Sequence, residues 1–171
     1  TGYPTVFWDG RYRTDIGAGS IPSAKATYTG SINVCGNRIV KDIDIDLFVS
    51  WLGGTEMEID VSVDNNEAST YDGRIRVYIT EIVSSRGWYD TGGHLYTYTF
   101  LDWAFNEDIS ITAGGSWDDS ITWDGSSNGF PTVTEDNIMI IAAVFNSNSG
   151  YVDETSAAAP GGGGGAPDPP G

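Results

Sequence analysis

The chain has 171 residues, enough for one domain, and carries 24 acidic but only 8 basic side chains, a formal net charge of −16. A field of that sign repels phosphate backbones and anionic lipid, so we expect no nucleic-acid partner and no binding to a membrane surface. No apolar run approaches the length of a membrane span, and the single cysteine, Cys35, has no partner for an intrachain disulfide.

The first segment, TGYPTVFWDGRYRTDIG, predicts two short strands around a turn at Asp9 and Gly10. The first of these strands is apolar on both faces, so it needs neighbours above, below and beside it. Residues 20–36 contain a run of Thr, Tyr, Thr and Gly at positions 27–30, which predicts a poor helix.

Segments 40–53, 55–66 and 73–84 alternate apolar and polar residues with a period of two, which is typical of strands with one buried face. Gly53 and Gly54 between the first two segments predict a hairpin turn. The residues that we expect to point into the core are Ile43, Ile45, Leu47, Met57, Ile59, Val61, Val63, Ile75, Val77, Ile79 and Glu81.

Further strand signals follow at 94–105, 107–115, 116–125 and 136–147, each bounded by Gly, Asn or Asp. The last segment is continuously apolar, so we expect it in the middle of a sheet, buried on both faces. The whole pattern predicts an all-β protein: an antiparallel β-sandwich, immunoglobulin-like or jelly-roll-like, of about seven to eight strands. We divide the chain into an N-terminal strand segment (1–36), the sandwich (37–158) and a Gly/Pro-rich tail (159–171).

The stretch GYPTVFWDGRYRTDIGAG resembles the second half of a thioredoxin fold, in which a proline (here Pro4) precedes a central strand, a tight turn and a return strand ending in glycine. Followed by a sandwich, it resembles secreted thioredoxin-like proteins of the Omp28-related type. That resemblance and the acidic, Lys-poor composition imply an extracellular or cell-surface protein. The family's Cys-x-x-Cys, first two strands and first helix are absent from this sequence, and Cys35 lies where a structural thiol is expected. We therefore expect no thiol–disulfide exchange and no enzyme activity.

Because the family's partner strands are absent, we expect a second copy of the chain to complete the first strand. Strand addition to another subunit's sandwich supplies backbone hydrogen bonds and pockets for alternate side chains. Such a head-to-tail contact does not close, so it builds a helical filament or a surface layer. The tail and the Ser/Thr-rich loops are candidate sites for attached O-linked glycans, which the sequence does not decide. The predicted donor strand consists of Tyr3, Pro4, Thr5, Val6, Phe7 and Trp8.

Acidic residues near strand ends offer a second interpretation, a site for structural calcium, which prefers carboxylate and carbonyl oxygens gathered from loops. The candidate ligands are Asp118, Asp119 and Asp124, although Asp is equally a turn former. No other cofactor is expected. The only histidine, His94, lies beside a turn without an evident orienting partner, so we do not expect it to act as a catalytic base.

Aromatic residues offer a third interpretation, because their faces can stack on sugar rings as well as fill a core. The alternatives to a filament are therefore a monomeric cell-surface module that binds carbohydrate or calcium, and the C-terminal fragment of a thioredoxin-like oxidoreductase. The aromatic candidates for a sugar platform are Trp88, Tyr89, Tyr96, Tyr98, Trp103, Trp117 and Trp123.

Overall fold

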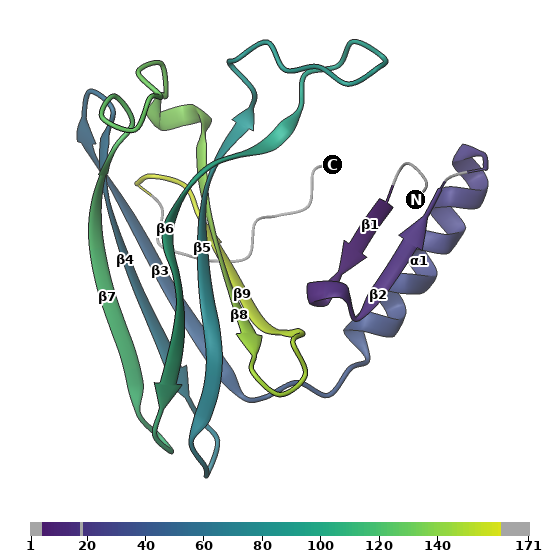
Figure 1. The fold of residues 1–171 in the computed structure, drawn as a ribbon, viewed down its shortest axis with the longest axis vertical. Helices are drawn as coiled ribbons and strands as arrows, with labels where there is room; N and C mark the ends of the chain where they lie inside the picture. Colours follow the sequence, from purple (N-terminus) through teal and green to yellow (C-terminus); the bar gives the residue numbers. More distant parts are fainter. Residues whose placement is uncertain (1–4, 18, 162–171) are drawn as a thin grey trace.

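The computed structural model describes residues 5–17 and 19–161, which form a β-sandwich with a smaller lobe beside it (Figure 1). The lobe consists of β1 (Thr5–Trp8), the 3₁₀ turn η1 (Asp9–Arg11), β2 (Arg13–Ile16) and α1 (Ile21–Gly36). The sandwich consists of β3 (Ile43–Gly53), β4 (Glu56–Asn65), β5 (Tyr71–Val83), β6 (Thr97–Ile111), β7 (Ser116–Asp124), η2 (Glu135–Asn137), β8 (Ile138–Asn146) and β9 (Val152–Ala158).

The sandwich has two antiparallel sheets, one of three strands in the order β3-β4-β7 and one of four strands in the order β6-β5-β8-β9. The prediction of an all-β antiparallel sandwich is therefore confirmed. Strand β8 lies between β5 and β9, which agrees with an interior position for segment 136–147. In Figure 1 the lobe lies on the side of the four-stranded sheet, away from β7.

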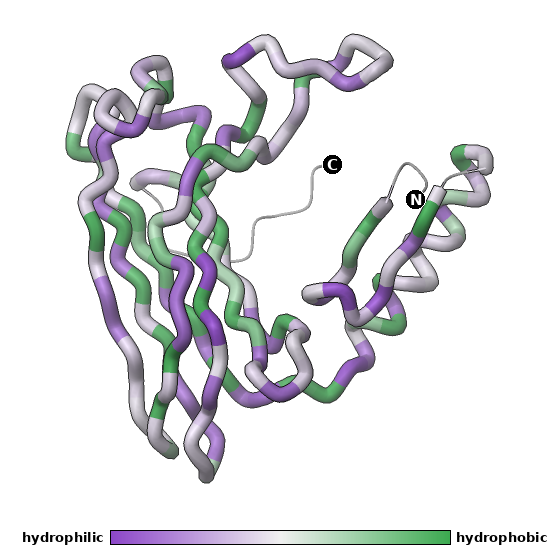
Figure 2. The backbone as a smooth tube through the Cα atoms, in the orientation of Figure 1, coloured by the Kyte–Doolittle hydropathy of each residue, from purple (hydrophilic) through white to green (hydrophobic). Residues whose placement is uncertain are grey.

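The core lies between the two sheets and follows the alternation of the sequence, which Figure 2 shows along the strands. Of the residues expected to point inward, only Ile45 is half-buried, and the others are buried. Glu81 is among the fully buried ones, and its carboxylate accepts hydrogen bonds from the backbone nitrogen and the hydroxyl of Ser85, at 3.0 and 2.5 Å. The buried acid is therefore satisfied by the turn that follows its own strand.

Two details of the strand assignment differ from the expectation. Segments 94–105 and 107–115 belong largely to one long strand, β6, whose pairing with β5 shifts register twice. The predicted break at Asn106 lies inside this strand, where Asn106 pairs with Arg76. Strand β9 was expected only as an exit segment, yet it pairs with β8 and closes the sheet on that side.

Residues 21–36 form a helix, so the expectation of a poor helix was wrong. Its N-terminus carries strong start signals: the Ser20 side chain accepts a hydrogen bond from the Ser23 backbone nitrogen, and Pro22 occupies the first turn. Tyr28 packs edge-on against Trp8 of β1, with ring centroids 5.7 Å apart. Capping and this contact outweigh the weak propensity of the Thr and Gly residues. None of the helices in the described ranges is long and apolar enough to cross a membrane.

Replacing Ile79 by alanine should lower the free energy of unfolding by about 2–5 kcal/mol, because the side chain is fully buried between the sheets. Ile39→Ala is the matched control, since Ile39 is 98% exposed. Chemical denaturation of both variants measures the difference. An equal loss in the two variants would contradict the assigned core.

Candidate functional site

Strand β1, which contains four of the six predicted donor residues, pairs antiparallel with β2 and belongs to neither sheet of the sandwich. Tyr3 and Pro4 lie outside the described residues. On one face Trp8 packs against α1, and its indole nitrogen donates a hydrogen bond to Asp15 at 2.8 Å. The same chain therefore covers one edge of β1 with β2 and one face with α1. The sequence had suggested that less of this strand would be covered.

The other edge of β1, beside Val6 and Phe7, has no strand hydrogen-bonded to it within residues 5–17 and 19–161. Phe7 is 53% exposed, and three apolar side chains of α1 are exposed as well: Ile21, Ile32 and Val34. A two-stranded hairpin is marginally stable on its own and needs further strands or a helix against it. The lobe therefore has the character of an incomplete unit that depends on its neighbours.

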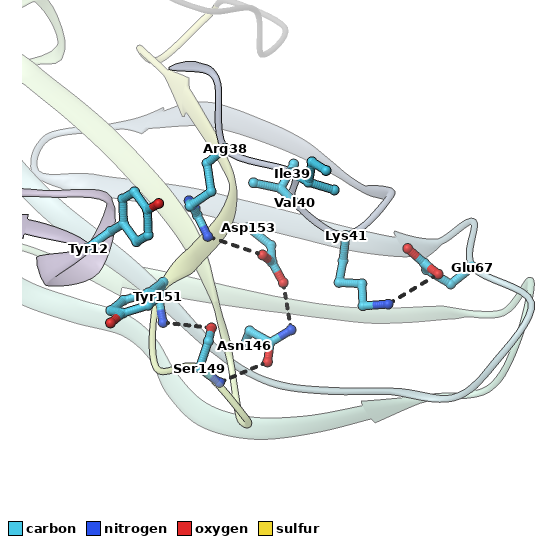
Figure 3. Close-up of a pocket in the computed structure, with 10 residues that line it drawn as sticks. All are labelled: Tyr12, Arg38, Ile39, Val40, Lys41, Glu67, Asn146, Ser149, Tyr151 and Asp153. Atoms are coloured by element: carbon cyan, nitrogen blue, oxygen red, sulfur yellow. Dashed lines mark hydrogen bonds and ion pairs between the residues drawn. The ribbon is translucent and has the colours of Figure 1, made fainter. Parts of the chain in front are cut away.

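Arg38, the second residue after α1, joins the lobe to the sandwich (Figure 3). Its Nε lies 3.4 Å from the Asp9 carboxylate in the lobe, and its Nη1 lies 3.7 Å from the Asp153 carboxylate in β9. Nη2 donates a hydrogen bond to the carbonyl of Val152, and the guanidinium lies 5.3 Å from the ring centre of Tyr12. One cation thus contacts both parts of the molecule at once.

Asp153 is buried, so its charge needs several partners. Besides its ion pair with Arg38, it accepts hydrogen bonds from the Tyr71 hydroxyl at 3.1 Å and from Asn146 Nδ2 at 2.8 Å. Figure 3 shows the bond from Asn146. Burial, and then the neighbouring Asp153 charge, raise the pKa of Tyr71 far above its ordinary value. Tyr71 therefore remains a neutral hydrogen-bond donor to the carboxylate.

Apolar contacts close the rest of this junction. Tyr12 of the lobe meets Tyr151 edge to face at 5.2 Å between ring centres. Gly10 approaches the sandwich so closely that an added Cβ would lie 3.0 Å from the Phe145 ring and from the Val152 backbone. Gly10 also has a φ of +64°, a region that glycine adopts without strain. The turn between β1 and β2 is therefore fitted to the sandwich surface.

A cavity of about 400 Å³ runs along the junction, and it continues from Arg38 to Lys41 and Glu67 (Figure 3). These two residues form an exposed ion pair at 3.4 Å. A hydrogen bond from the Asp42 backbone, and then the charge of Lys41, lower the pKa of Glu67. Every charged group in this cavity has an internal partner, so we interpret it as a structural joint.

The predicted calcium ligands do not come together. Asp118 and Asp119 are consecutive on β7 and point to opposite faces, and Asp124 lies about 20 Å further along the strand. Asp124 instead accepts hydrogen bonds from Thr55, Ser126 and Ser127 in a turn; the bond from the Ser127 hydroxyl, followed by that from Thr55, lowers its pKa. In the part of the chain that the structure describes, no group of three His, Cys, Asp or Glu side chains could hold a metal ion.

The aromatic candidates divide into core and surface. Trp123 is buried and Trp117 packs against Phe105, so both belong to the core. The others are exposed, on the arm of residues 84–96 or on β6: Trp88, Tyr89, Tyr96, Tyr98 and Trp103. His94 lies exposed on the same arm, 3.1 Å from Asp90. Hydrogen bonds from the backbone and side chain of His94 lower the pKa of Asp90.

Sequence reasoning missed Arg38, which had no recognisable motif. The available signal was its position: a cation between a helix and a strand, in a chain with only eight basic residues. Its partners Asp9 and Asp153 are far apart in sequence, so only the fold brings them to it.

No known family model matches the chain, and no curated protein sequence is significantly similar to it. Among solved structures it is similar to parts of a β-glucosidase of glycoside hydrolase family GH3 from Bifidobacterium adolescentis (11% identity, TM-score 0.42, 70% of this chain and 17% of that one). It is also similar to part of a calcium binding mutant of β-glucuronidase 2 from Bacteroides uniformis (10% identity, TM-score 0.39, 67% of this chain and 13% of that one). A third similar structure is a β-glucosidase from Listeria innocua (15% identity, TM-score 0.36, 71% of this chain and 16% of that one).

The chain spans less than a fifth of each of these enzymes. At such low TM-scores the likenesses carry no argument about fold or activity.

Replacing Arg38 by methionine should loosen the lobe from the sandwich, because it leaves the buried Asp153 without its cation. Removing one partner of a buried ion pair typically costs about 3–5 kcal/mol. Hydrogen exchange should show the amides of α1 losing protection while those of β5 and β8 keep theirs. Arg13→Met, which removes the same charge from an exposed site, is the control. Unchanged exchange in α1 would contradict the joint.

Stability should also fall as the pH rises above about 10, the ordinary pKa of tyrosine. The unfolded chain then releases the Tyr71 proton while the folded chain keeps it, so deprotonation favours unfolding. The difference in free energy of unfolding between the wild type and Tyr71→Phe should therefore shrink between pH 9 and pH 11. Urea titrations at a series of pH values measure it, and a constant difference would contradict the raised pKa.

Proposed function

We propose that the chain is a non-catalytic structural protein that assembles head to tail with further copies of itself, through strand addition at the lobe. The observation that carries this proposal is the edge of β1 beside Val6 and Phe7, to which no described strand is bonded. An exposed strand edge is a template for pairing with another chain. Here β1 joins a neighbour while it keeps β2 as its own partner.

The distribution of charge supports a contact between unlike surfaces. Residues 1–36 contain three basic and two acidic side chains, whereas residues 37–158 contain five basic and 21 acidic ones. The lobe of one copy is therefore attracted to the sandwich of another, and two sandwiches repel each other. Such an arrangement favours a heterologous contact, which repeats without closing and yields a filament or a layer.

The β7 edge of the three-stranded sheet, together with the acidic outer face beside it, is the acceptor surface that fits best. Acidic side chains lie along it: Asp44, Asp46, Glu58, Asp60, Asp64 and Asp118. Asp44 and Asp64 lie directly opposite each other in the register, an arrangement that a cationic partner relieves. Strand β7 forms the edge of this sheet, and a groove of about 320 Å³ beside it contains the half-exposed Phe48. Arg11 and Arg13 of the lobe supply the complementary charge.

An extracellular or cell-surface location and attached glycans belong to the same proposal. They are supported by the acidic surface and by the resemblance of the first residues to secreted thioredoxin-like proteins. Glycans on the Gly/Pro tail would lie mostly outside the described residues.

A second candidate function is favoured by one specific observation, the element order β1-β2-α1. This is the order that the resemblance implies for the second half of a thioredoxin fold. In that case a β-α-β segment, and not a second copy, pairs with β1, and the chain forms part of a thioredoxin-like oxidoreductase. The coding sequence upstream of the Thr1 codon decides whether such a segment with a Cys-x-x-Cys exists.

Sedimentation velocity over a range of concentrations tests the assembly. We expect a growing series of oligomers that Phe7→Asp abolishes, because a carboxylate beside β1 faces the acidic acceptor. Ile21→Asp is the matched control: it adds the same charge at an exposed apolar site of the same lobe and should assemble normally. Electron microscopy of the wild type should show filaments or sheets.

Two results would contradict the proposal. One is a wild-type chain that stays monomeric up to about millimolar concentration, where even weak interfaces are populated. The other is an equal loss of assembly in Phe7→Asp and Ile21→Asp, which would attribute assembly to general charge effects.

A further inference from the structure

A second and larger cavity, of about 800 Å³, lies between the lobe and the outer face of the four-stranded sheet. The lobe contributes Phe7 and Arg11 to its lining, and the sheet contributes Arg74, Arg76, Tyr78 and Phe145. Along β5 the three outward residues Arg74, Arg76 and Tyr78 alternate with buried residues, so the strand geometry directs them away from the core. The volume falls in the range of small-molecule sites, about 300–1,000 Å³.

Three of the six arginines of this strongly acidic chain line this one cavity. Arg74 is internally satisfied: its Nη1 lies 2.8 Å from Asp108, and it donates to the side chain and the carbonyl of Asn106 at 3.0 and 2.9 Å. Asp108 is also the one carboxylate in the described lining. The positive charge of the other two arginines is therefore not neutralised within the cavity.

Arg76 and Arg11 form no ion pair with any described residue. The Nε of Arg76 is buried and has no hydrogen-bond partner among them, which is unusual for a buried donor. Its guanidinium lies 4.4 Å from the ring centre of Phe145, and that of Arg11 lies 4.8 Å from the ring centre of Phe7. Stacking on a ring holds a guanidinium plane in place while its edge stays available for a ligand.

Tyr78 connects the cavity to a cluster of exposed aromatic rings on β6. Tyr78 contacts Trp103 and Phe100, with ring centres 4.6 and 6.2 Å away. A ligand therefore meets cationic donors and flat aromatic faces together. Guanidinium groups match carboxylates in bidentate geometry, and aromatic faces stack on flat or pyranose rings.

We propose that this cavity is a binding site for a small carboxylate-bearing ring compound, of the class of a uronic acid or an aromatic acid. Arg76 and Arg11 hold the carboxylate, and the rings of Tyr78 and Phe145 contact the body of the ligand. The cavity shares Phe7 with the assembly proposal, but its central residue, Arg76, lies on β5 and not on β1, so Arg76→Met tests the site separately from assembly.

Isothermal titration calorimetry of the full chain with D-glucuronate, benzoate, D-glucose and inorganic phosphate tests the site. We expect binding of one or both carboxylates, with glucuronate favoured if the ligand is a sugar acid and benzoate if it is an aromatic acid. D-glucose lacks the carboxylate and phosphate lacks the ring, so both should bind more weakly. Arg76→Met should weaken binding by about tenfold or more, the worth of a charge-assisted hydrogen bond.

Arg86→Met is the matched control. The Arg86 guanidinium also stacks on a ring, 4.5 Å from the centre of Phe130, and donates to the Gly129 carbonyl, but it does not line the cavity. It should bind the ligand as the wild type does. Arg11→Met, at an exposed position in the lobe, should weaken binding even if Arg76→Met proves unstable.

Three outcomes would overturn the site: neither carboxylate binds, phosphate or glucose binds as well as the acids, or Arg86→Met loses as much affinity as Arg76→Met. A monomeric protein that binds glucuronate would overturn the assembly proposal alone. An assembling protein that binds neither acid would overturn the cavity site alone.

Discussion

The ion pairs of Arg38 with Asp9 and Asp153 are the interaction on which the arrangement of the molecule depends. The lobe is a hairpin and one helix, too small to bury a core of its own. Its position is set because one guanidinium bridges a lobe carboxylate and a buried sandwich carboxylate. Tyr71 and Asn146 satisfy the remaining oxygen of Asp153, so the buried charge is compensated in full.

Both proposals follow from this joint. It holds η1 against β9, while β1 keeps an edge to which no described strand is bonded. It also sets the lobe across the face of the four-stranded sheet, which encloses the cavity with Arg11 on one side and Arg76 on the other. The joint therefore gives the molecule two unlike sides: a lobe side with unpaired arginines, and an acidic sheet face beyond β7.

The sandwich was predictable because its signal is local. Period-two alternation identified the inward residues of β3, β4 and β5, including the unusual Glu81. The helix α1 was not predicted because the helix propensity of its Thr and Gly residues is weak, and its start signals are confined to Ser20 and Pro22. Strand β9 is polar in sequence, and only pairing with β8 makes it a strand. Neither site could be predicted, since Arg38 with its acids and Arg11 with Arg76 meet only after the lobe docks.

The most direct test of this account is the distance between lobe and sandwich in solution. The native Cys35 is first replaced by serine, and spin labels are attached to Lys25→Cys in α1 and Thr122→Cys in β7, which are both exposed sites. Pulsed electron paramagnetic resonance then measures the distance between the two labels. The account predicts one narrow distance distribution, which broadens when Arg38 is replaced by methionine. A broad distribution in the protein with Arg38 intact would contradict it, because the lobe would then not be held by that residue.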